Sequence, residues 1–303
     1  MRAVQFSKYG SPEVLNVVDV GEPHAGPGQV RIAVRAAGVN PSDWKRMAGK
    51  YRDHEEVTFP SGLGVEGAGI VDEVGPGVSN ISVADAVFGC GEHTMAMAQY
   101  AVLSCWAHKP EDMSFEVAGG LPVIADTATR ALDEVGVKSG ETLLVSGAAG
   151  GIGSAVLQFA RLRGIDLIGT ASARKHDYLR DLGAIPTTYG SGLAERVREL
   201  ASEGVDAALD LAGSAIIPEL IEIVGDPSRV LSVADFSATK FGAKFSSGPS
   251  KDLERILADV ARLCSEGLFR LHVDQTFSLE QTAEAQEASA KGHVTGKLVI
   301  VVS

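Results

Sequence analysis

The stretch TLLVSGAAGGIG, residues 142–153, constrains the fold of this chain more strongly than any other segment. Its first part is an apolar run typical of a buried strand, and a helical pattern begins directly after the glycines. A glycine-rich turn in this context predicts a dinucleotide site, because the start of a helix offers N–H groups and a dipole that favour a pyrophosphate. The alternative is a purely structural turn. We favour dinucleotide binding because strand and helix patterns alternate after residue 153.

The individual glycines have separate expected roles. Gly150 would let the backbone approach the pyrophosphate, and Gly153 would allow the helix to pack closely on its strand. Ala148 stands where the usual pattern has its first glycine, and this departure slightly relaxes the tight turn. The predicted pyrophosphate-binding residues are Ala149, Gly150, Gly151 and Ile152.

The rest of the chain has two textures. Residues 1–121 contain short alternating stretches and glycine-proline turns, which predict an irregular β domain. Residues 122–265 alternate strands and helices and predict a Rossmann α/β domain, a doubly wound parallel sheet. Residues 266–303 return to strand, helix and strand. The strands expected in the central part span residues 142–146, 166–171, 185–188, 205–211 and 229–234, with a weaker sixth at 244–247.

The end of the second predicted strand selects the cofactor. An acid there would bind the ribose 2′-OH of NAD, whereas basic groups accommodate the 2′-phosphate of NADP. Ser172 stands nineteen residues after Gly153 and is followed by Arg174 and Lys175, with no acid nearby. These groups can give charge-assisted hydrogen bonds to phosphate, so we predict NADP. The alternative is a helix start with solvated charges.

The amino-acid composition and net charge limit the kinds of partner that the chain can bind. The 303 residues carry 27 Lys and Arg against 39 Asp and Glu, a net charge of −12, with no basic cluster. Nucleic acid and anionic membranes are therefore poor partners. The first residues lack the apolar run of a signal peptide, and no segment is apolar enough to span a bilayer. We expect a cytoplasmic protein.

The three cysteines, Cys90, Cys105 and Cys264, are widely spaced and predict no disulfide framework, which suits a reducing compartment. Cys90 and His93 could form half of a metal site. A structural zinc needs four ligands, and no second pair stands at ligand spacing. We therefore expect no metal and read the pair as a small apolar residue and a loop histidine.

Several motifs together identify a family resemblance over essentially the whole chain. They are the segments 37–43 (AGVNPSD), 60–69 (PSGLGVEGAG), 148–153 (AAGGIG) and 182–184 (LGA), and the closing GKLV at 296–299. The chain resembles the medium-chain dehydrogenase/reductase superfamily, most closely its zinc-independent quinone oxidoreductase branch. This resemblance implies a chaperonin-10-like (GroES-like) β domain completed by the C-terminal segment, a Rossmann domain, an active site in the cleft between them, and a homodimer.

The resemblance also shows which metal ligands are missing. Zinc-dependent relatives have ligands at the positions of Asn40, Val65 and Val123, and their lobe of four cysteines is replaced here by the short segment 91–95. A catalytic zinc needs three protein ligands and an open position. Zinc helps to oxidise an alcohol by acidifying its hydroxyl, whereas a quinone or enone is already an electrophile. The loss therefore points to conjugated carbonyl acceptors.

By the same resemblance, the nicotinamide lies near Asn40, Asp43 and Tyr51, the predicted catalytic residues. An amide or phenol could donate to a carbonyl oxygen as negative charge develops on it. Each residue also has a structural alternative, because 40–43 could be a turn followed by a helix cap, and solvent could deliver the proton. Glu66 is expected to be buried and structural. The resemblance adds cofactor contacts from Asn40, Thr127, Tyr189, Leu211, Ala212, Ser232, Val233 and Ala234.

The sequence thus predicts an NADPH-dependent reductase that transfers a hydride to a small quinone or α,β-unsaturated carbonyl without a metal. One alternative is an enoyl or alkenal reductase, which acts on a C=C bond with the same cofactor. Another is a non-catalytic NADPH-binding protein. The segment 236–247 fits no pattern of the family, so its role and the shape of the acceptor stay open.

Overall fold

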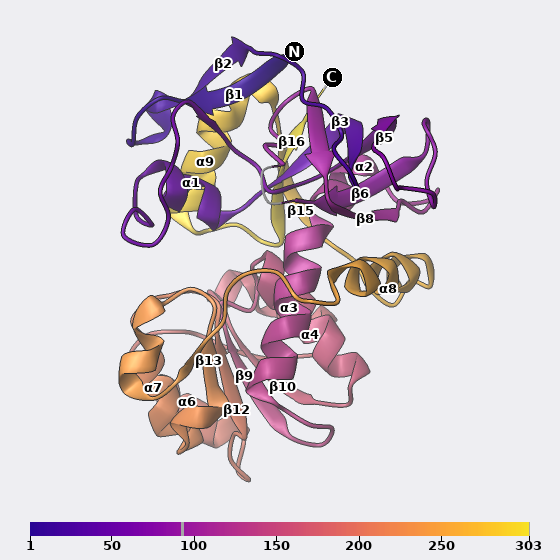
Figure 1. Ribbon diagram of the computed structural model, residues 1–303. Coiled ribbons are helices and arrows are strands. Elements are labelled where there is room, and N and C mark those ends of the chain that lie inside the picture. The colour runs from indigo at the N-terminus through magenta and orange to yellow at the C-terminus, as the bar shows by residue number, and fades with distance from the viewer. Residues whose placement is uncertain (92–93, 303) are drawn as a thin grey trace. The chain divides into compact units, whose positions relative to one another are not determined.

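The computed structural model describes residues 1–91 and 94–302 (Figure 1). By contacts the chain divides into a split unit, Met1–Val123 with Leu253–Ser303, and a central unit, Ile124–Asp252. The sequence pattern predicts that the chain returns to the first domain after residue 265, whereas the contacts place the return at Leu253. The reason is that helix α8 (Leu253–Ser265) packs against strand β8 (Cys105–His108) of the split unit. The amphipathic pattern of this segment predicts a helix but does not indicate which part of the chain the helix packs against.

The central unit is built on a parallel sheet of six strands in the order β11-β10-β9-β12-β13-β14, which confirms the predicted Rossmann fold. Starting at β9, the chain runs outward to β10 and β11 and then crosses to β12 on the other side of β9. The strands are β9 (Thr142–Ser146), β10 (Asp166–Thr170), β11 (Ile185–Thr187), β12 (Ala207–Asp210), β13 (Val230–Ser232) and β14 (Lys244–Phe245).

Helices cover the sheet because its central strands are apolar on both faces. Leu143, Leu144 and Val145 of β9 are each fully buried. One face packs against α6 and α7, whose Val197 and Leu220 share a core with Leu144. Helix α4 packs against β10. The α-helices are α3 (Leu121–Val135), α4 (Gly151–Leu162), α5 (His176–Asp181), α6 (Leu193–Leu200) and α7 (Ile217–Val224). Short 3-10 turns are η2 (Ala173–Lys175), η3 (Pro227–Arg229) and η4 (Phe236–Phe241).

The split unit contains two sheets, which agrees with the expected β domain. The larger runs β15-β16-β3-β5-β6-β8, with β7 also paired to β3, and the smaller runs β2-β1-β4. Strand β16 lies antiparallel to β3, so the end of the chain completes the sheet, as the resemblance implied. The strands are β1 (Arg2–Phe6), β2 (Asn16–Asp19), β3 (Val30–Val39), β4 (Ser61–Gly62), β5 (Glu66–Val74), β6 (Ala86–Cys90), β7 (Tyr100–Leu103), β15 (Val273–Ser278) and β16 (Lys297–Val301).

Helices α1 (Pro41–Met47), α2 (Phe115–Gly119) and α9 (Thr282–Lys291), with short turns η1 (Pro12–Val14) and η5 (Leu279–Gln281), complete the split unit. Helix α1 contacts α9, and α2 contacts β3 and β5. The main core includes Phe6, Ile32, Met47 and Leu298, each at most 2% exposed. Residues from both ends of the chain therefore share one core, which fixes β16 beside β3.

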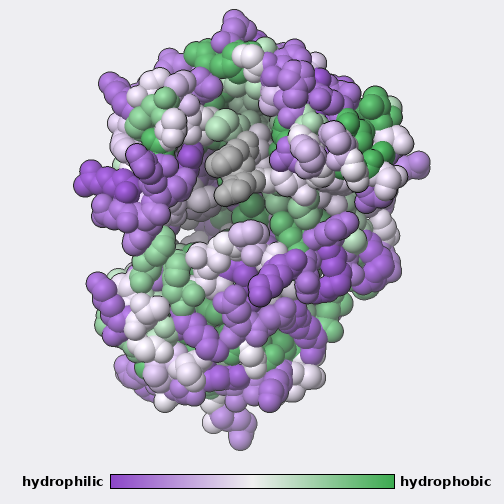
Figure 2. Space-filling view, in the orientation of Figure 1, coloured by the Kyte–Doolittle hydropathy of each residue, from purple (hydrophilic) through white to green (hydrophobic). Residues whose placement is uncertain are grey.

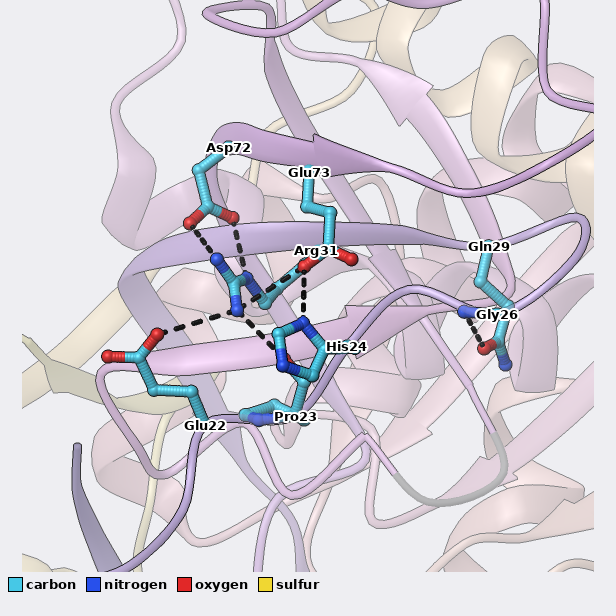
Figure 3. Close-up of polar contacts among 8 residues, drawn as sticks. All are labelled: Glu22, Pro23, His24, Gly26, Gln29, Arg31, Asp72 and Glu73. Atoms are coloured by element: carbon cyan, nitrogen blue, oxygen red, sulfur yellow. Dashed lines mark hydrogen bonds and ion pairs between the residues drawn. The ribbon is translucent and has the colours of Figure 1, made fainter.

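Arg31 ties a loop to the larger sheet (Figure 3). Its guanidinium on β3 donates to both carboxylate oxygens of Asp72 on β5, at 3.1 and 2.8 Å, and to the carbonyl of Pro23 at 2.9 Å. Glu73 and Glu22 lie within 3.3 and 3.5 Å of the same group. The hydrogen bond to Asp72 raises the pKa of Arg31, and Tyr100 stacks under the guanidinium at 4.9 Å.

The surface carries many of the charged residues. Figure 2 shows hydrophilic residues spread over the visible face of both units, with smaller apolar areas between them. Within the described part of the chain, every helix is too short or too polar to cross a membrane.

Candidate functional site

The glycine turn between β9 and α4 has the geometry that the sequence predicts. Gly147 has φ +77°, a left-handed conformation that favours glycine. A Cβ on Gly153 would lie 2.4 Å from the carbonyl oxygen of Gly147 and 2.6 Å from the backbone of Ala148. Gly153 therefore permits the close approach of helix and strand, as expected. Ala148 is accommodated because its methyl faces Gly169 on β10, where a Cβ would lie 2.9 Å away.

The other side of this turn is open and can hold a phosphate. A Cβ on Gly150 would meet only the carbonyl oxygen of Gly147, at 3.6 Å. Gly150 is the N-cap of α4, and the hydrogen bond from Ser154 N to Gly150 O, at 2.8 Å, closes the first turn. The backbone N–H groups of Gly151 and Ile152 precede that bond, at the positive end of a 12-residue helix. The residues present therefore fit a dinucleotide pyrophosphate.

The residues predicted for the 2′-phosphate follow neighbouring strands. Ser172 comes two residues after β10 and caps η2, which contains Arg174 and Lys175. Tyr189 comes two residues after β11, which pairs with β10 in parallel, and its side chain is 59% exposed. Arg174 is exposed and Lys175 is half-buried. A hydroxyl, two cations and an aromatic ring thus follow the carboxyl ends of two neighbouring strands, and these are groups that suit a phosphate.

Asp210, which sequence reasoning missed, organises the ends of β12 and β13. Its carboxylate is fully buried and accepts hydrogen bonds from the N–H groups of Ala212 and Gly213, at 3.1 and 2.9 Å. It also accepts from the hydroxyl of Ser232 at 2.8 Å, and the same hydroxyl accepts from Ala234 N at 3.1 Å. One acid thereby fixes both loops. The sequence feature that could have identified Asp210 is an acidic residue at the end of the otherwise apolar strand 207–210.

The predicted ribose contacts lie on these two loops. They begin immediately after the fourth and fifth strands of a parallel sheet, where ligands of such sheets bind. Ser232 is the last residue of β13 and is fully buried. Its hydroxyl makes the hydrogen bonds to Asp210 and Ala234 that hold the two loops. The other predicted contacts here are Leu211, Ala212, Val233 and Ala234.

Helix α3 carries Thr127 and anchors the segment that the sequence left unexplained. Thr127 is 8% exposed. Its neighbour Asp126 accepts a hydrogen bond from Ser250 N at 3.0 Å, and Arg130 donates to the hydroxyl of Ser246. The segment 236–247 forms η4 and the edge strand β14. The hydrogen bond from Arg130 to Ser246 ties the end of this segment to α3.

In the split unit, Asn40 and Asp43 form the start of α1. The N–H of Asn40 donates to the carboxylate of Asp43 at 2.8 Å, and the N–H of Asp43 donates to the carbonyl of Asn40 at 3.0 Å. Pro41 occupies the first position of the helix, where its missing N–H costs nothing. Asn40 and Asp43 are 4% and 3% exposed. The structural alternative of a turn and helix cap is thus present at the predicted catalytic residues.

Glu66 and Lys297 complete a buried polar cluster around Asn40. The Lys297 ammonium donates to Asn40 Oδ1 at 2.6 Å and to Glu66 Oε1 at 2.7 Å. The Asn40 amide donates to Glu66 Oε1 at 2.7 Å, and Val123 N donates to Glu66 Oε2 at 2.7 Å. Glu66 is fully buried, as expected, whereas the sequence singles out Lys297 only as part of a motif. Its partners come from segments 257 and 231 residues away.

The environment of this cluster alters its acid–base chemistry. Burial raises the pKa of Asp43 from 3.8 to about 6, against the lowering effects of the Asn40 N–H and the Lys297 charge. Burial also raises the pKa of Tyr51, and the charge of Asp43 adds to this shift. Tyr51 therefore keeps its phenol proton at neutral pH and can donate a hydrogen bond.

The family resemblance assigns the zinc-ligand positions of zinc-dependent relatives to Asn40, Val65 and Val123. Asn40 has its side-chain oxygen bound to Lys297 and Val123 offers its backbone N–H to Glu66. Among residues 1–91 and 94–302, no group of three or more His, Cys, Asp or Glu side chains is arranged to hold a metal ion. The hypothetical half site of Cys90 and His93 involves a residue outside the described ones.

Two sequence families match the chain. Residues 26–123 match the family described as alcohol dehydrogenase GroES-like domain, and residues 182–300 match the family described as zinc-binding dehydrogenase. The first match lies in the split unit, which confirms the expected GroES-like domain.

Among curated proteins, the chain is similar to the chloroplastic quinone oxidoreductase QR1 of Triphysaria versicolor. The two are 30% identical, and the match covers 99% of this chain and 98% of QR1. A second relative is the pikromycin polyketide synthase component PikAII of Streptomyces venezuelae, 35% identical over 91% of this chain. This chain spans only 8% of the length of that much larger synthase.

Solved structures agree. The quinone oxidoreductase from Coxiella burnetii is 30% identical with a TM-score of 0.85, and the match covers 100% of this chain and 99% of that one. A mycobacterial protein solved in complex with NADPH is 25% identical with a TM-score of 0.87, covering 99% of this chain and 100% of its own. The chain therefore belongs to the quinone oxidoreductase-like branch of the medium-chain dehydrogenase/reductase superfamily.

Proposed function

We propose that this chain is an NADPH-dependent reductase that reduces a small quinone or α,β-unsaturated carbonyl without a metal. The observation that carries the proposal is the open glycine turn at Gly150, together with two cations in place of an acid after the end of the next strand. Full-length similarity to a quinone oxidoreductase supports the acceptor class. NADPH, when bound, supplies the hydride for such a reduction.

The central unit provides the binding groups. The N–H groups of Gly151 and Ile152 bind the pyrophosphate, with Ala149 and Gly150 leaving room for it. Arg174 and Lys175, with Ser172 and Tyr189, hold the 2′-phosphate. The buried carboxylate of Asp210 keeps the loops after β12 and β13 in place for the ribose.

The split unit provides hydrogen-bond donors for the acceptor. Lys297 can only donate and the Glu66 carboxylate can only accept, so the orientation of the Asn40 amide is fixed. One Asn40 N–H is committed to Glu66, and the amide carries a second. We propose that this second N–H and the Tyr51 phenol donate to the acceptor oxygen, while Asp43 positions Asn40. Such donors suffice for an acceptor whose conjugation delocalises the incoming charge.

The decisive experiment is a panel of acceptors with NADPH oxidation as the readout. Small quinones and enals should oxidise NADPH steadily, and ethanol and isopropanol should not reduce NADP. Rapid NADP-dependent oxidation of isopropanol, without turnover of quinones or enones, would contradict the proposal. Elemental analysis of the purified protein should find no stoichiometric zinc, and chelators should leave the activity intact.

The same panel separates the alternatives through its products. A quinone reductase yields the hydroquinone, whereas an enoyl reductase saturates the C=C bond of an enal and leaves its carbonyl. A non-catalytic protein would bind NADPH, seen as a change in nucleotide fluorescence, with every acceptor unreacted.

We further propose a homodimer in the cytoplasm. The family supports the dimer, and three cysteines present as thiols fit a reducing compartment. Sedimentation analysis should give twice the chain mass of 31.5 kDa. Fractionation of the source cells tests the location.

A further inference from the structure

Two cysteines that are far from any predicted function meet in the split unit. Cys90 is the last residue of β6, and Cys105 is the first residue of β8. These strands pair antiparallel, and the register places Cys90 directly opposite Cys105. Folding thus juxtaposes two thiols whose wide spacing in the sequence gave no reason to pair them.

Strand pairing gives the distance that a disulfide requires. Residues directly opposite on antiparallel strands project to the same face, with Cβ atoms about 4.5 to 5.5 Å apart. A disulfide needs Cα atoms roughly 4.4 to 6.8 Å apart, which such a pair satisfies, and Cβ atoms roughly 3.5 to 4.5 Å apart, so the two Cβ atoms must move closer together when the bond forms. The strands also approach closely here, because a Cβ on Gly89 would lie 2.1 Å from the carbonyl oxygen of Cys105.

Cys90, Cys105 and Cys264 are all half-buried, so burial class alone does not separate them. Cys264, on α8, lies in surroundings whose burial raises the pKa of its thiol to about 12, with the charge of Asp112 as a smaller cause. Reaction requires the thiolate, so Cys264 is a poor nucleophile at neutral pH. It supplies a matched control within the same unit.

We propose that Cys90 and Cys105 are a reversible modification site that forms an intramolecular disulfide with a hydroperoxide as the oxidant. One sulfur attacks the peroxide, the O–O bond breaks, and a sulfenic acid and an alcohol or water form. The second sulfur then attacks the first, so that the S–S bond forms, the S–O bond breaks and water leaves. Two thiols lose two hydrogens and two electrons, and the peroxide accepts them.

The disulfide would change the edge of the larger sheet. Strand β8 is the last strand in that sheet and pairs with β6. A bond from Cys90 to Cys105 closes the intervening segment 91–104 into a loop and fixes the edge strand to its neighbour. Closing a loop of this length reduces the freedom of the unfolded chain, so oxidation should raise the melting temperature by roughly 5 °C.

Treatment of the full-length protein with hydrogen peroxide, followed by unfolding in denaturant, alkylation of the remaining thiols and non-reducing peptide mapping, tests the proposal. We expect a peptide linked through Cys90 and Cys105, with Cys264 still alkylated. Dithiothreitol should restore all three thiols and reverse the shift in melting temperature. The variant Cys264→Ser should behave like the wild type, and Cys105→Ser should show neither the linked peptide nor the shift.

Three results would overturn the proposal. The first is separate alkylation of Cys90 and Cys105 after a peroxide treatment that oxidises methionine. The second is linkage of either residue to Cys264 or to another chain. The third is an equal shift in melting temperature for Cys105→Ser and the wild type. Because the readout is a covalent bond in the protein, these results do not depend on reductase activity.

Discussion

The glycine turn of the central unit and the polar cluster of the split unit position their polar groups in opposite ways. The turn is contiguous, spans residues 146–153, and works through backbone N–H groups and the absence of side chains. The cluster joins Asn40, Asp43, Glu66 and Lys297, and works through side chains buried together. The difference predicts that changes in the turn affect ligand binding separately from stability, whereas changes in the cluster affect stability first.

The largest effect is expected from Lys297→Met. The substitution leaves the fully buried Glu66 carboxylate without its cation, and breaking a buried pair costs about 3 to 5 kcal/mol of unfolding free energy. Urea denaturation measures this loss. Lys8→Met, at an exposed position, is the control and should change stability by less than about 0.5 kcal/mol.

A double variant, Lys297→Met with Glu66→Gln, sharpens this result. It removes both charges and keeps an acceptor for Val123 N, so it should be more stable than Lys297→Met alone. Equal stability of the single and double variants would mean that Lys297 acts by packing and not by its charge.

Asp43→Asn tests the acid of the cluster through pH. The folded-state pKa of Asp43, about 6, lies above its ordinary value of 3.8, so the folded chain holds this proton more firmly than the unfolded chain does. The wild type therefore loses stability as pH rises from about 4 to about 6, by about 3 kcal/mol, and stays lower above that window. The amide of the variant does not titrate, and its oxygen can still accept the hydrogen bond from Asn40 N.

The difference in unfolding free energy between Asp43→Asn and the wild type should thus grow in favour of the variant across that window. Denaturation at pH 4, 5, 6 and 7 measures it. A difference that is constant with pH would show that folding does not raise the pKa of Asp43.

Two glycine substitutions separate packing from binding in the turn. Gly153→Ala places a Cβ 2.4 Å from the carbonyl oxygen of Gly147, which forces a backbone shift and costs about 1 to 3 kcal/mol of stability. Gly150→Ala points its Cβ into open space, so the melting temperature should change by less than about 2 °C. The same methyl enters the predicted pyrophosphate space and should weaken NADPH binding at least about tenfold, or 1.4 kcal/mol.

Calorimetry and NADPH titration of both variants test this division. Full NADPH affinity in a stable Gly150→Ala protein would place the pyrophosphate elsewhere.

The smallest effect is expected at the proposed 2′-phosphate site. Changing Arg174 and Lys175 together to Ala should raise the NADPH dissociation constant at least about tenfold, because charge-assisted hydrogen bonds contribute about 1.5 to 3 kcal/mol each. NADH binding should change little, since NADH has no 2′-phosphate. Equal losses for both nucleotides would indicate that these cations act on the pyrophosphate or on the fold.

Local sequence patterns were enough to predict the central unit and the chemistry of its turn. Helix and strand periods are local, and a turn such as 146–153 needs only neighbouring residues to set its geometry, so the parallel sheet and the role of Gly153 could be predicted. The assignment of NADP rests on Ser172, Arg174 and Lys175, which also lie within a few residues of one another.

Which distant residues meet became clear only from the folded chain. Lys297 joins Asn40 because β16 pairs with β3, Asp210 binds Ser232 because β12 and β13 are neighbours, and Cys90 faces Cys105 through the register of β6 and β8. The local pattern of apolar residues does not indicate which distant residues come into contact, since these contacts depend on strand order and register over long separations. The same reason explains why α8 could be predicted as a helix while its packing against β8 could not.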